Sequence, residues 1–330
     1  MQKLIVMLSI CLMGTAVLVA ESCGNRCAGW PSFSPCEHSP WPSSFNIDVG
    51  GGFRKDKFKW SKGGQAVANP DGSLPPYGIR SNLNWKDLRI AQFGGTAEYV
   101  SCRNYAVRIE ASYGRIYHGK NIDSDYFVID DESTKFAVAE SKAGKGHVYD
   151  LSAAVGYRIT STCRRFVATP LIGYSQYAQY LHMYDGSMRL DLSENKLGPF
   201  PGLNSTYTTR WFGPWIGLDF TTRVERCAYL FGSFQWHMLT YRGHGRWNLR
   251  HDIGPFNHKA YGYGYLATLG GKWEIWNNWS LGIVGSYRMF RTKHGHVRVK
   301  LLPEDVLGYE RFNGAIWHSF SASAIVAWRF

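Results

Sequence analysis

Two closely spaced aspartates, Asp123 and Asp125, have the type and spacing that best suit acid–base chemistry in this sequence. Neighbouring carboxylates resist double ionisation, so one can hold a proton while the other activates a water molecule. The alternative is an ordinary solvated acidic loop, because Asp130, Asp131 and Glu132 follow closely.

Such a pair needs a partner base, which is usually a histidine oriented by a carboxylate. His244, His251 and Asp252 lie in one later segment and are the candidates. The adjacent His251 and Asp252 could supply a base only if their loop bends toward the aspartates. Three further histidines could bind a metal, although exposed histidines on a wet rim are far commoner: His258, His294 and His296. We therefore predict no metal site and no cofactor.

The two ends of the chain indicate export. Lys3 precedes an almost wholly apolar stretch, and Leu18-Val19-Ala20 comes just before polar residues. This order predicts a signal peptide over residues 1–20; a single membrane helix and a lipoprotein anchored at Cys23 are weaker alternatives. Residues 21–43 are rich in Cys, Pro and Ser and predict a periplasmic leader. Residues 44–330 predict one membrane-inserted domain.

The remaining chain alternates with a period of two residues. Tyr149, Leu151 and Ala153 share one face of such a segment. Aromatic residues make up 15% of the chain and there are 36 glycines, yet no later apolar stretch is long enough for a membrane helix. Together these features predict an all-β fold, a transmembrane antiparallel β-barrel. The predicted strands are about 45–60, 84–100, 105–117, 149–159, 165–181, 208–223, 226–240, 261–275, 278–293 and 315–330.

The last strand ends the chain on an aromatic residue, Phe330, and it resembles the closing strand of bacterial outer-membrane barrels. About ten strands is an even number, so we expect both termini in the periplasm. The long segments 118–146, 182–207, 241–258 and 294–314 are then extracellular loops, and the alternate connections are short periplasmic turns.

Six cysteines remain after the signal peptide, and this topology places all of them on the oxidising periplasmic side. They are Cys23, Cys27, Cys36, Cys102, Cys163 and Cys227. We predict disulfides that tie the leader to the barrel base or the barrel to other cysteine-rich envelope proteins, and unpaired thiols are the alternative. Six cysteines allow 15 pairings, so the sequence does not choose among them.

Four short motifs resemble those of the omptins, outer-membrane proteases with ten-stranded barrels. They are Gly52-Phe53-Arg54-Lys55-Asp56-Lys57-Phe58, Ser81-Asn82-Leu83-Asn84-Trp85-Lys86, Asp123-Ser124-Asp125-Tyr126 and Pro214-Trp215-Ile216-Gly217-Leu218. The resemblance implies an omptin-like fold and a role for Asp123 and Asp125 as the first catalytic pair. The second omptin pair, Asp-x-His, does not occur in this chain, and its positions fall near Arg246 and Asn248. The overall layout also resembles the porin-like outer-membrane proteins of chlamydia-related bacteria.

Three function classes remain open. The preferred one is a porin-like or structural envelope barrel, and the alternatives are an omptin-type endopeptidase and a surface adhesin. A barrel of this size is mostly filled by its own side chains, but small inward residues on strands 149–159 and 261–275 could leave a narrow channel. The formal net charge of +12 favours attraction to lipopolysaccharide, a possible bound lipid, over nucleic acid in an exported protein.

Overall fold

The computed structural model describes residues 43–63, 80–126, 135–161, 165–225, 227–276, 278–302 and 306–330. The predicted signal peptide and nearly all of the predicted leader lie outside the described residues. In the described part of the chain, no helix is long and apolar enough to cross a membrane. The strands are β1 (Ser44–Gly63), β2 (Ser81–Val100), β3 (Tyr105–Tyr126), β4 (Lys135–Tyr157), β5 (Ile159–Thr160), β6 (Phe166–Asp191), β7 (Gly198–Arg223), β8 (Ala228–Arg246), β9 (Ile253–Trp276), β10 (Trp279–Leu301) and β11 (Val306–Arg329).

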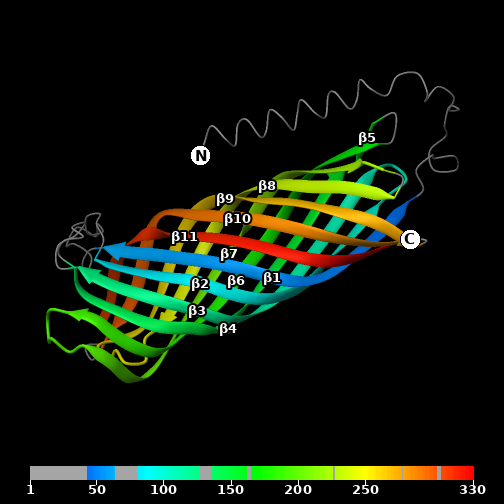
Figure 1. The fold of residues 1–330 in the computed structure, drawn as a ribbon. Coiled ribbons are helices and arrows are strands. Elements are labelled where there is room, and N and C mark those ends of the chain that lie inside the picture. The colour runs from blue at the N-terminus through cyan, green and yellow to red at the C-terminus, as the bar shows by residue number, and fades with distance from the viewer. Residues whose placement is uncertain are drawn as a thin grey trace, which may run out of the picture.

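The strands form one antiparallel sheet that closes on itself. Each long strand pairs with its sequence neighbours, β4 pairs with β6, and β1 pairs with β11 (Figure 1). The two-residue β5 pairs only with β6 and extends one edge. The predicted all-β, antiparallel barrel is therefore confirmed, with ten long strands in the closed ring.

The barrel has two unlike ends. At one end, here called the turn end, lie Phe330 and the short connections around residues 101–104 and 224–227 (Figure 1). The opposite end, here called the loop end, is where β1, β3, β6, β8 and β10 end and where the long strands that follow them begin. The described connections at this end are residues 192–197 and 247–252.

The strands run further toward the loop end than the sequence pattern predicted. Much of 118–146, 182–207, 241–258 and 294–314, predicted as loops, is strand. In this part of the barrel the pattern is inverted, because Tyr207 and Trp211 point inward and are fully buried while Thr206 and Arg210 are exposed. Such segments lack the apolar outward face that marks a lipid-exposed strand, so the pattern alone did not identify them.

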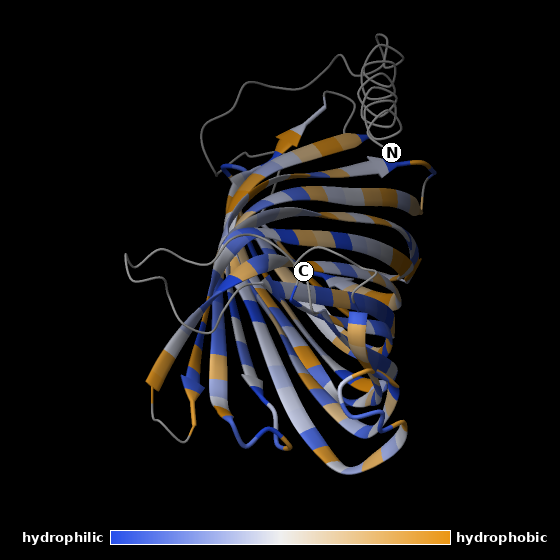
Figure 2. Ribbon diagram, turned by 90° about the vertical axis from the view of Figure 1, so that its left-hand side faces the viewer, coloured by the Kyte–Doolittle hydropathy of each residue, from blue (hydrophilic) through white to orange (hydrophobic). Residues whose placement is uncertain are grey.

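The outer face of the turn-end half is apolar, as contact with lipid requires. Ile109, Leu151 and Ile283 are each roughly half exposed or more. Tryptophans gather at the turn end, where Trp279 and Trp328 stack with ring centroids 5.3 Å apart. Figure 2 shows apolar and polar residues alternating along the strands. This arrangement matches the aromatic girdle of a membrane barrel.

The middle of the lumen is filled by an aromatic plug. Its members are almost completely buried: Phe58, Trp60, Trp85, Tyr207, Trp211, Tyr241, Phe290, Phe312 and Trp317. Strands β1 and β7 are on opposite sides of the ring, yet the rings of Phe58 and Tyr207 stack at 6.0 Å. Tyr177 of β6 and Trp317 of β11, also on opposite strands, meet at 6.2 Å. Side chains from opposite walls therefore touch across the lumen.

A cluster of ion pairs lies directly beneath the plug, toward the turn end. Arg54 contacts Asp56 at 2.8 Å and Asp150 at 3.0 Å, and Arg288 contacts the same Asp150 oxygen at 3.0 Å. Gln179 donates a hydrogen bond of 2.7 Å to Asp56. These bonds link four strands, so charged side chains are buried here only as mutual partners.

Candidate functional site

A pocket of about 400 Å³ opens at the loop end, above the plug. Asp123 and Asp125, near the end of β3, stand on one wall, and Arg250 and Asp252, from the connection between β8 and β9, stand on the other. Trp60 of the plug is among the residues that line it. The structure thus brings Asp123, Asp125 and Asp252 of the predicted site into one pocket.

The two aspartates on β3 differ in their surroundings from an exposed acidic loop. Burial, and next the negative charge of Asp125, raise the pKa of Asp123 well above the ordinary value of 3.8. Asp123 Oδ1 is buried without a hydrogen-bond partner in the described part of the chain. One carboxyl of the pair can therefore hold a proton beside its neighbour, as acid–base chemistry requires.

A guanidinium faces this pair. Arg250 bonds Asp252 through two contacts, at 2.7 and 2.5 Å, and its positive charge also acts on Asp123 and Asp125. The bond from Arg250 lowers the pKa of Asp252. Asp252 is thus paired with Arg250 in the described structure. In a catalytic dyad it would instead have to hydrogen-bond and orient His251.

The predicted histidines do not join the aspartates. His244 is exposed, and its Nδ1 is 3.0 Å from Oδ1 of Asn257. His251 is exposed as well, and neither residue is among those that line the pocket. The positions that correspond to the omptin Asp-x-His pair hold Arg246, the last residue of β8, and Asn248.

Asn248 has a structural task of its own. Its Oδ1 accepts hydrogen bonds from the Asn204 backbone N–H at 2.7 Å and the Ser205 hydroxyl at 3.0 Å. Its Nδ2 donates to the carbonyl of Gly202 at 2.7 Å. The side chain therefore fastens the β8–β9 connection to β7 and does not point a free base at the aspartates.

A buried histidine, His258, packs against the plug residue Trp60, and the sequence analysis considered it only as a possible metal ligand in an outer loop. His258 of β9 is 1% exposed, and its ring lies 4.6 Å from that of Trp60. Its Nδ1 and the hydroxyl of Tyr207 are hydrogen-bonded at 2.7 Å, and burial lowers its pKa well below 6.5. The sequence signal for this position is the alternation of β9, because Phe256, His258 and Ala260 fall on one face and are all buried.

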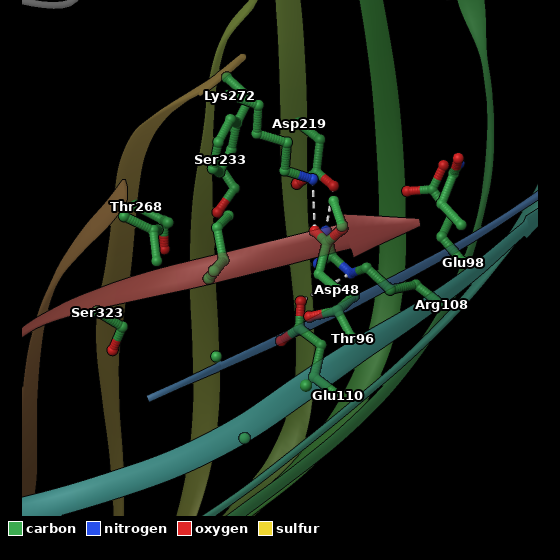
Figure 3. Close-up of a pocket in the computed structure, with 18 of the residues that line it drawn as sticks. Asp48, Thr96, Glu98, Arg108, Glu110, Asp219, Ser233, Thr268, Lys272 and Ser323 are labelled. Atoms are coloured by element: carbon green, nitrogen blue, oxygen red, sulfur yellow. Dashed lines mark hydrogen bonds and ion pairs between the residues drawn. The ribbon is translucent and has the colours of Figure 1, made fainter. Parts of the chain in front are cut away.

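A second, larger cavity occupies the turn-end half of the lumen. This turn-end chamber has a volume of about 1100 Å³, and Trp276 and Arg329, the last residues of β9 and β11, are among those that line it. Figure 3 shows charged side chains meeting inside it, with the hydroxyls of Ser233, Thr268 and Ser323 also on its wall.

Ion pairs cross the chamber from several strands. Lys272 and Asp48 are 2.5 Å apart, Arg158 and Glu98 are 2.5 Å apart, and Arg108 bonds both Asp219 and Glu110. This cavity was not predicted as a site. Its signal in the sequence was the small and hydroxyl-bearing inward face of strands 149–159 and 261–275.

The described cysteines lie at the turn end. Cys102 is in the connection between β2 and β3, and Cys227, next to β8, is an exposed free thiol. The predicted disulfides of Cys227, within the chain or to another envelope protein, stay a prediction. The other candidates, Cys23, Cys27, Cys36 and Cys163, lie outside the described residues.

The fold resembles that of a known outer-membrane protease. The outer membrane protease OmpT from Escherichia coli superimposes with a TM-score of 0.74 at 15% sequence identity, covering 91% of this chain and 99% of that one. The translocator domain of the autotransporter NalP from Neisseria meningitidis matches only at a TM-score of 0.35, with 10% identity and coverage of 89% and 90%. A search of curated protein sequences found no match. At these identities the likeness shows the fold alone.

Family membership comes from the sequence. The family model described as Protochlamydia outer membrane protein, Pom, matches residues 48–330, which is nearly the whole described barrel. The family and the fold together place the protein in the bacterial outer membrane. This chain belongs to the Protochlamydia outer membrane protein family and has an omptin-like β-barrel.

Proposed function

We propose that this protein is a closed, structural barrel of the outer membrane, with its loop end at the cell surface and its turn end in the periplasm. The observation that carries the proposal is the aromatic plug. Phe58 and Tyr207 stack across the barrel, and the ion cluster of Arg54, Asp150 and Arg288 seals the layer beneath. A solute would have to displace both layers to pass through.

Conductance in a planar lipid bilayer tests this proposal. We expect the refolded wild-type barrel to give no stepwise ion current, because the plug leaves no water-filled path. A Phe58→Ala/Tyr207→Ala variant should conduct, since it removes two rings that meet at the centre. Trp236→Ala, on the lipid-facing side of β8, is the matched control. Stepwise current through the wild-type barrel would refute the closed structure and favour the porin.

The second candidate function is an omptin-type endopeptidase. It is favoured by the Asp123 and Asp125 pair, by the raised pKa of Asp123, and by the pocket at the loop end. It is disfavoured by Arg250, which stands where an activated base would be needed, and by Asn248, whose side chain is already occupied.

Cleavage of a fluorogenic basic peptide decides between the two. We expect the wild-type barrel, with lipopolysaccharide supplied, to cleave no faster than an Asp123→Ala/Asp125→Ala variant. Cleavage that the double variant loses would establish the endopeptidase instead. A His258→Gln variant would then show whether the buried histidine takes part.

Two partners follow from the same orientation. Lys55, Lys57 and Lys59 are exposed at alternate positions of β1, just beyond the apolar band, where the phosphates of lipopolysaccharide would lie.

At the other end, the exposed thiol of Cys227 would face the oxidising periplasm. We infer that lipopolysaccharide binds the lysines and that Cys227 can form a disulfide with a cysteine-rich envelope protein.

A further inference from the structure

Two arginines in the turn-end chamber carry N–H groups that no atom of the described residues accepts. Arg108 is 6% exposed, and its Nη2 has no partner in the described part of the chain. Arg288 is 8% exposed, and the same holds for its Nε and Nη1. Both side chains line the chamber. Buried donors of this kind are normally matched by an acceptor, so they point to a ligand with negatively charged oxygens.

Aromatic rings hold these guanidinium groups in position. The Cζ of Arg288 lies 4.1 Å from the ring centroid of Tyr177 and 4.8 Å from that of Trp317. The Cζ of Arg108 lies 5.6 Å from the ring centroid of Trp215. A planar guanidinium fixed in this way loses little entropy on binding, and its fork geometry matches a carboxylate.

Carboxylate oxygens in the same chamber also lack partners. Oδ1 of Asp48, Asp150 and Asp219 is buried with no hydrogen-bond donor in the described residues, although each carboxylate bonds a base through its other oxygen. Arg108 is shared by Glu110 and Asp219, so this group has one more negative than positive charge. It suits an ammonium group.

The chamber as a whole is nearly neutral. Seven basic and six acidic residues line it, and they are interspersed around the wall. A simple anion would meet the carboxylates, and a simple cation would meet the arginines. A molecule that carries one charge of each sign can place its anionic end on Arg288 and its cationic end on Asp219.

The register of β3 and β4 shows how far apart the two sets lie along the barrel wall. Asp150, which bonds Arg288, lies across from Ser112 in the β3–β4 pairing, two residues along β3 from Glu110. Two residues of strand span about 7 Å along β3, which is the length of an extended dipeptide and about one residue less than that of a tripeptide. The hydroxyls of Ser233, Thr268 and Ser323 supply further groups for hydrogen bonds with peptide amides and carbonyls (Figure 3).

We propose that the turn-end chamber binds a zwitterionic di- or tripeptide, with its carboxylate on Arg288 and its ammonium group on Asp219 and Glu110. The bound peptide stays on one side of the plug, so the site is independent of proteolysis at the loop end. Under the proposed orientation, the ligand enters from the periplasm.

Calorimetric titration of the refolded full-length barrel in detergent tests the proposal with trialanine. We expect trialanine to bind, and N-acetyl-trialanine and trialanine amide each to bind at least about tenfold more weakly, because each lacks one charge. An Arg288→Gln variant should bind trialanine amide as tightly as it binds trialanine. It should still bind N-acetyl-trialanine more weakly than trialanine. Asp219→Asn should give the reverse pattern, since it removes the group that contacts the ammonium.

Asp185→Asn, at an exposed position of β6 toward the loop end that lines neither cavity, is the matched control and should bind trialanine as the wild type does. Resistance of each variant to unfolding in SDS at room temperature verifies that the barrel has formed. Failure of trialanine to bind a folded barrel overturns the proposal. Equal binding of the three peptides, or a penalty for one cap alone, also overturns it, because the site would then recognise at most one charge.

Discussion

The loop-end pocket and the turn-end chamber occupy the two halves of one lumen, but their walls differ in kind. Behind the pocket stands the aromatic plug, and the few charges on its wall include Asp123, which is buried beside a second carboxylate. The chamber has many charges, and most of them are paired across strands, as Lys272 is with Asp48. The same alternating backbone therefore supports an apolar core in one half and a polar network in the other.

The difference follows from what surrounds each half. Around the chamber the outward side chains are apolar, and the inward ones are polar, with most of the charged ones joined in ion pairs, as in membrane barrels. Around the plug the outward side chains are polar, so the inward ones supply the hydrophobic core of a water-soluble structure. The barrel thus combines a membrane protein at the turn end with a globular β-barrel at the loop end.

Truncation of a plug residue is expected to have the largest effect on this comparison. Trp211 is fully buried, with ring centroids at 4.6 Å from Tyr241 and 5.8 Å from Phe290. Trp211→Ala should lower the free energy of unfolding by about 3–5 kcal/mol, measured by chemical denaturation in lipid vesicles. Phe231→Ala, in the half-buried wall of the chamber, should cost about 1–2 kcal/mol. Equal losses would mean that the two halves do not differ in how they are stabilised.

The membrane half of the fold was predictable because lipid imposes a simple pattern. Strand 149–159 was identified from Tyr149, Leu151 and Ala153, and it lies almost wholly within β4 (Lys135–Tyr157). The plug was not predicted. The inward faces used to judge the lumen came from strands 149–159 and 261–275, whose small residues, such as Ser152 and Thr268, line the chamber only.

The candidate site was predictable in part for a related reason. Asp123 and Asp125 are two residues apart on one strand, so their spacing alone predicts that their side chains share one face. Their surroundings depend on the β8–β9 connection, which bonds of Asn248 to β7 hold in place, and on Arg250, which reaches across the pocket. No local pattern encodes such long-range contacts, so the sequence could place His244, His251 and Asp252 in the right loop without showing which of them faces the aspartates.

The buried histidine of the loop-end half offers a sharper test. Because burial lowers the pKa of His258 well below 6.5, the unfolded chain binds a proton below about pH 6.5 that the folded chain does not. Stability should therefore fall as the pH falls, by about 1.4 kcal/mol from this residue between pH 7.5 and pH 5.5. Measured as the difference between the wild type and His258→Gln, this loss should be absent in the variant. A difference that does not change with pH would mean that His258 binds its proton as tightly in the folded barrel as in the unfolded chain.

The smallest expected effect is the change in stability when one aspartate in each half is replaced by asparagine. The raised pKa of Asp123 means that its ionised form is less stable in the fold than in the unfolded chain. The wild type therefore loses stability as the pH rises from about 4 toward the raised pKa, and Asp123→Asn should be about 1 kcal/mol more stable at pH 8 and no more stable at pH 4. Asp48→Asn in the chamber should instead lose up to about 1 kcal/mol at pH 8, because Lys272 would lose its partner. Urea titration of both variants at the two pH values measures these differences in stability. A loss of stability in Asp123→Asn at pH 8 would contradict the expectation. It would mean that Arg250 and Lys62 stabilise the ionised Asp123 as fully as Lys272 stabilises Asp48.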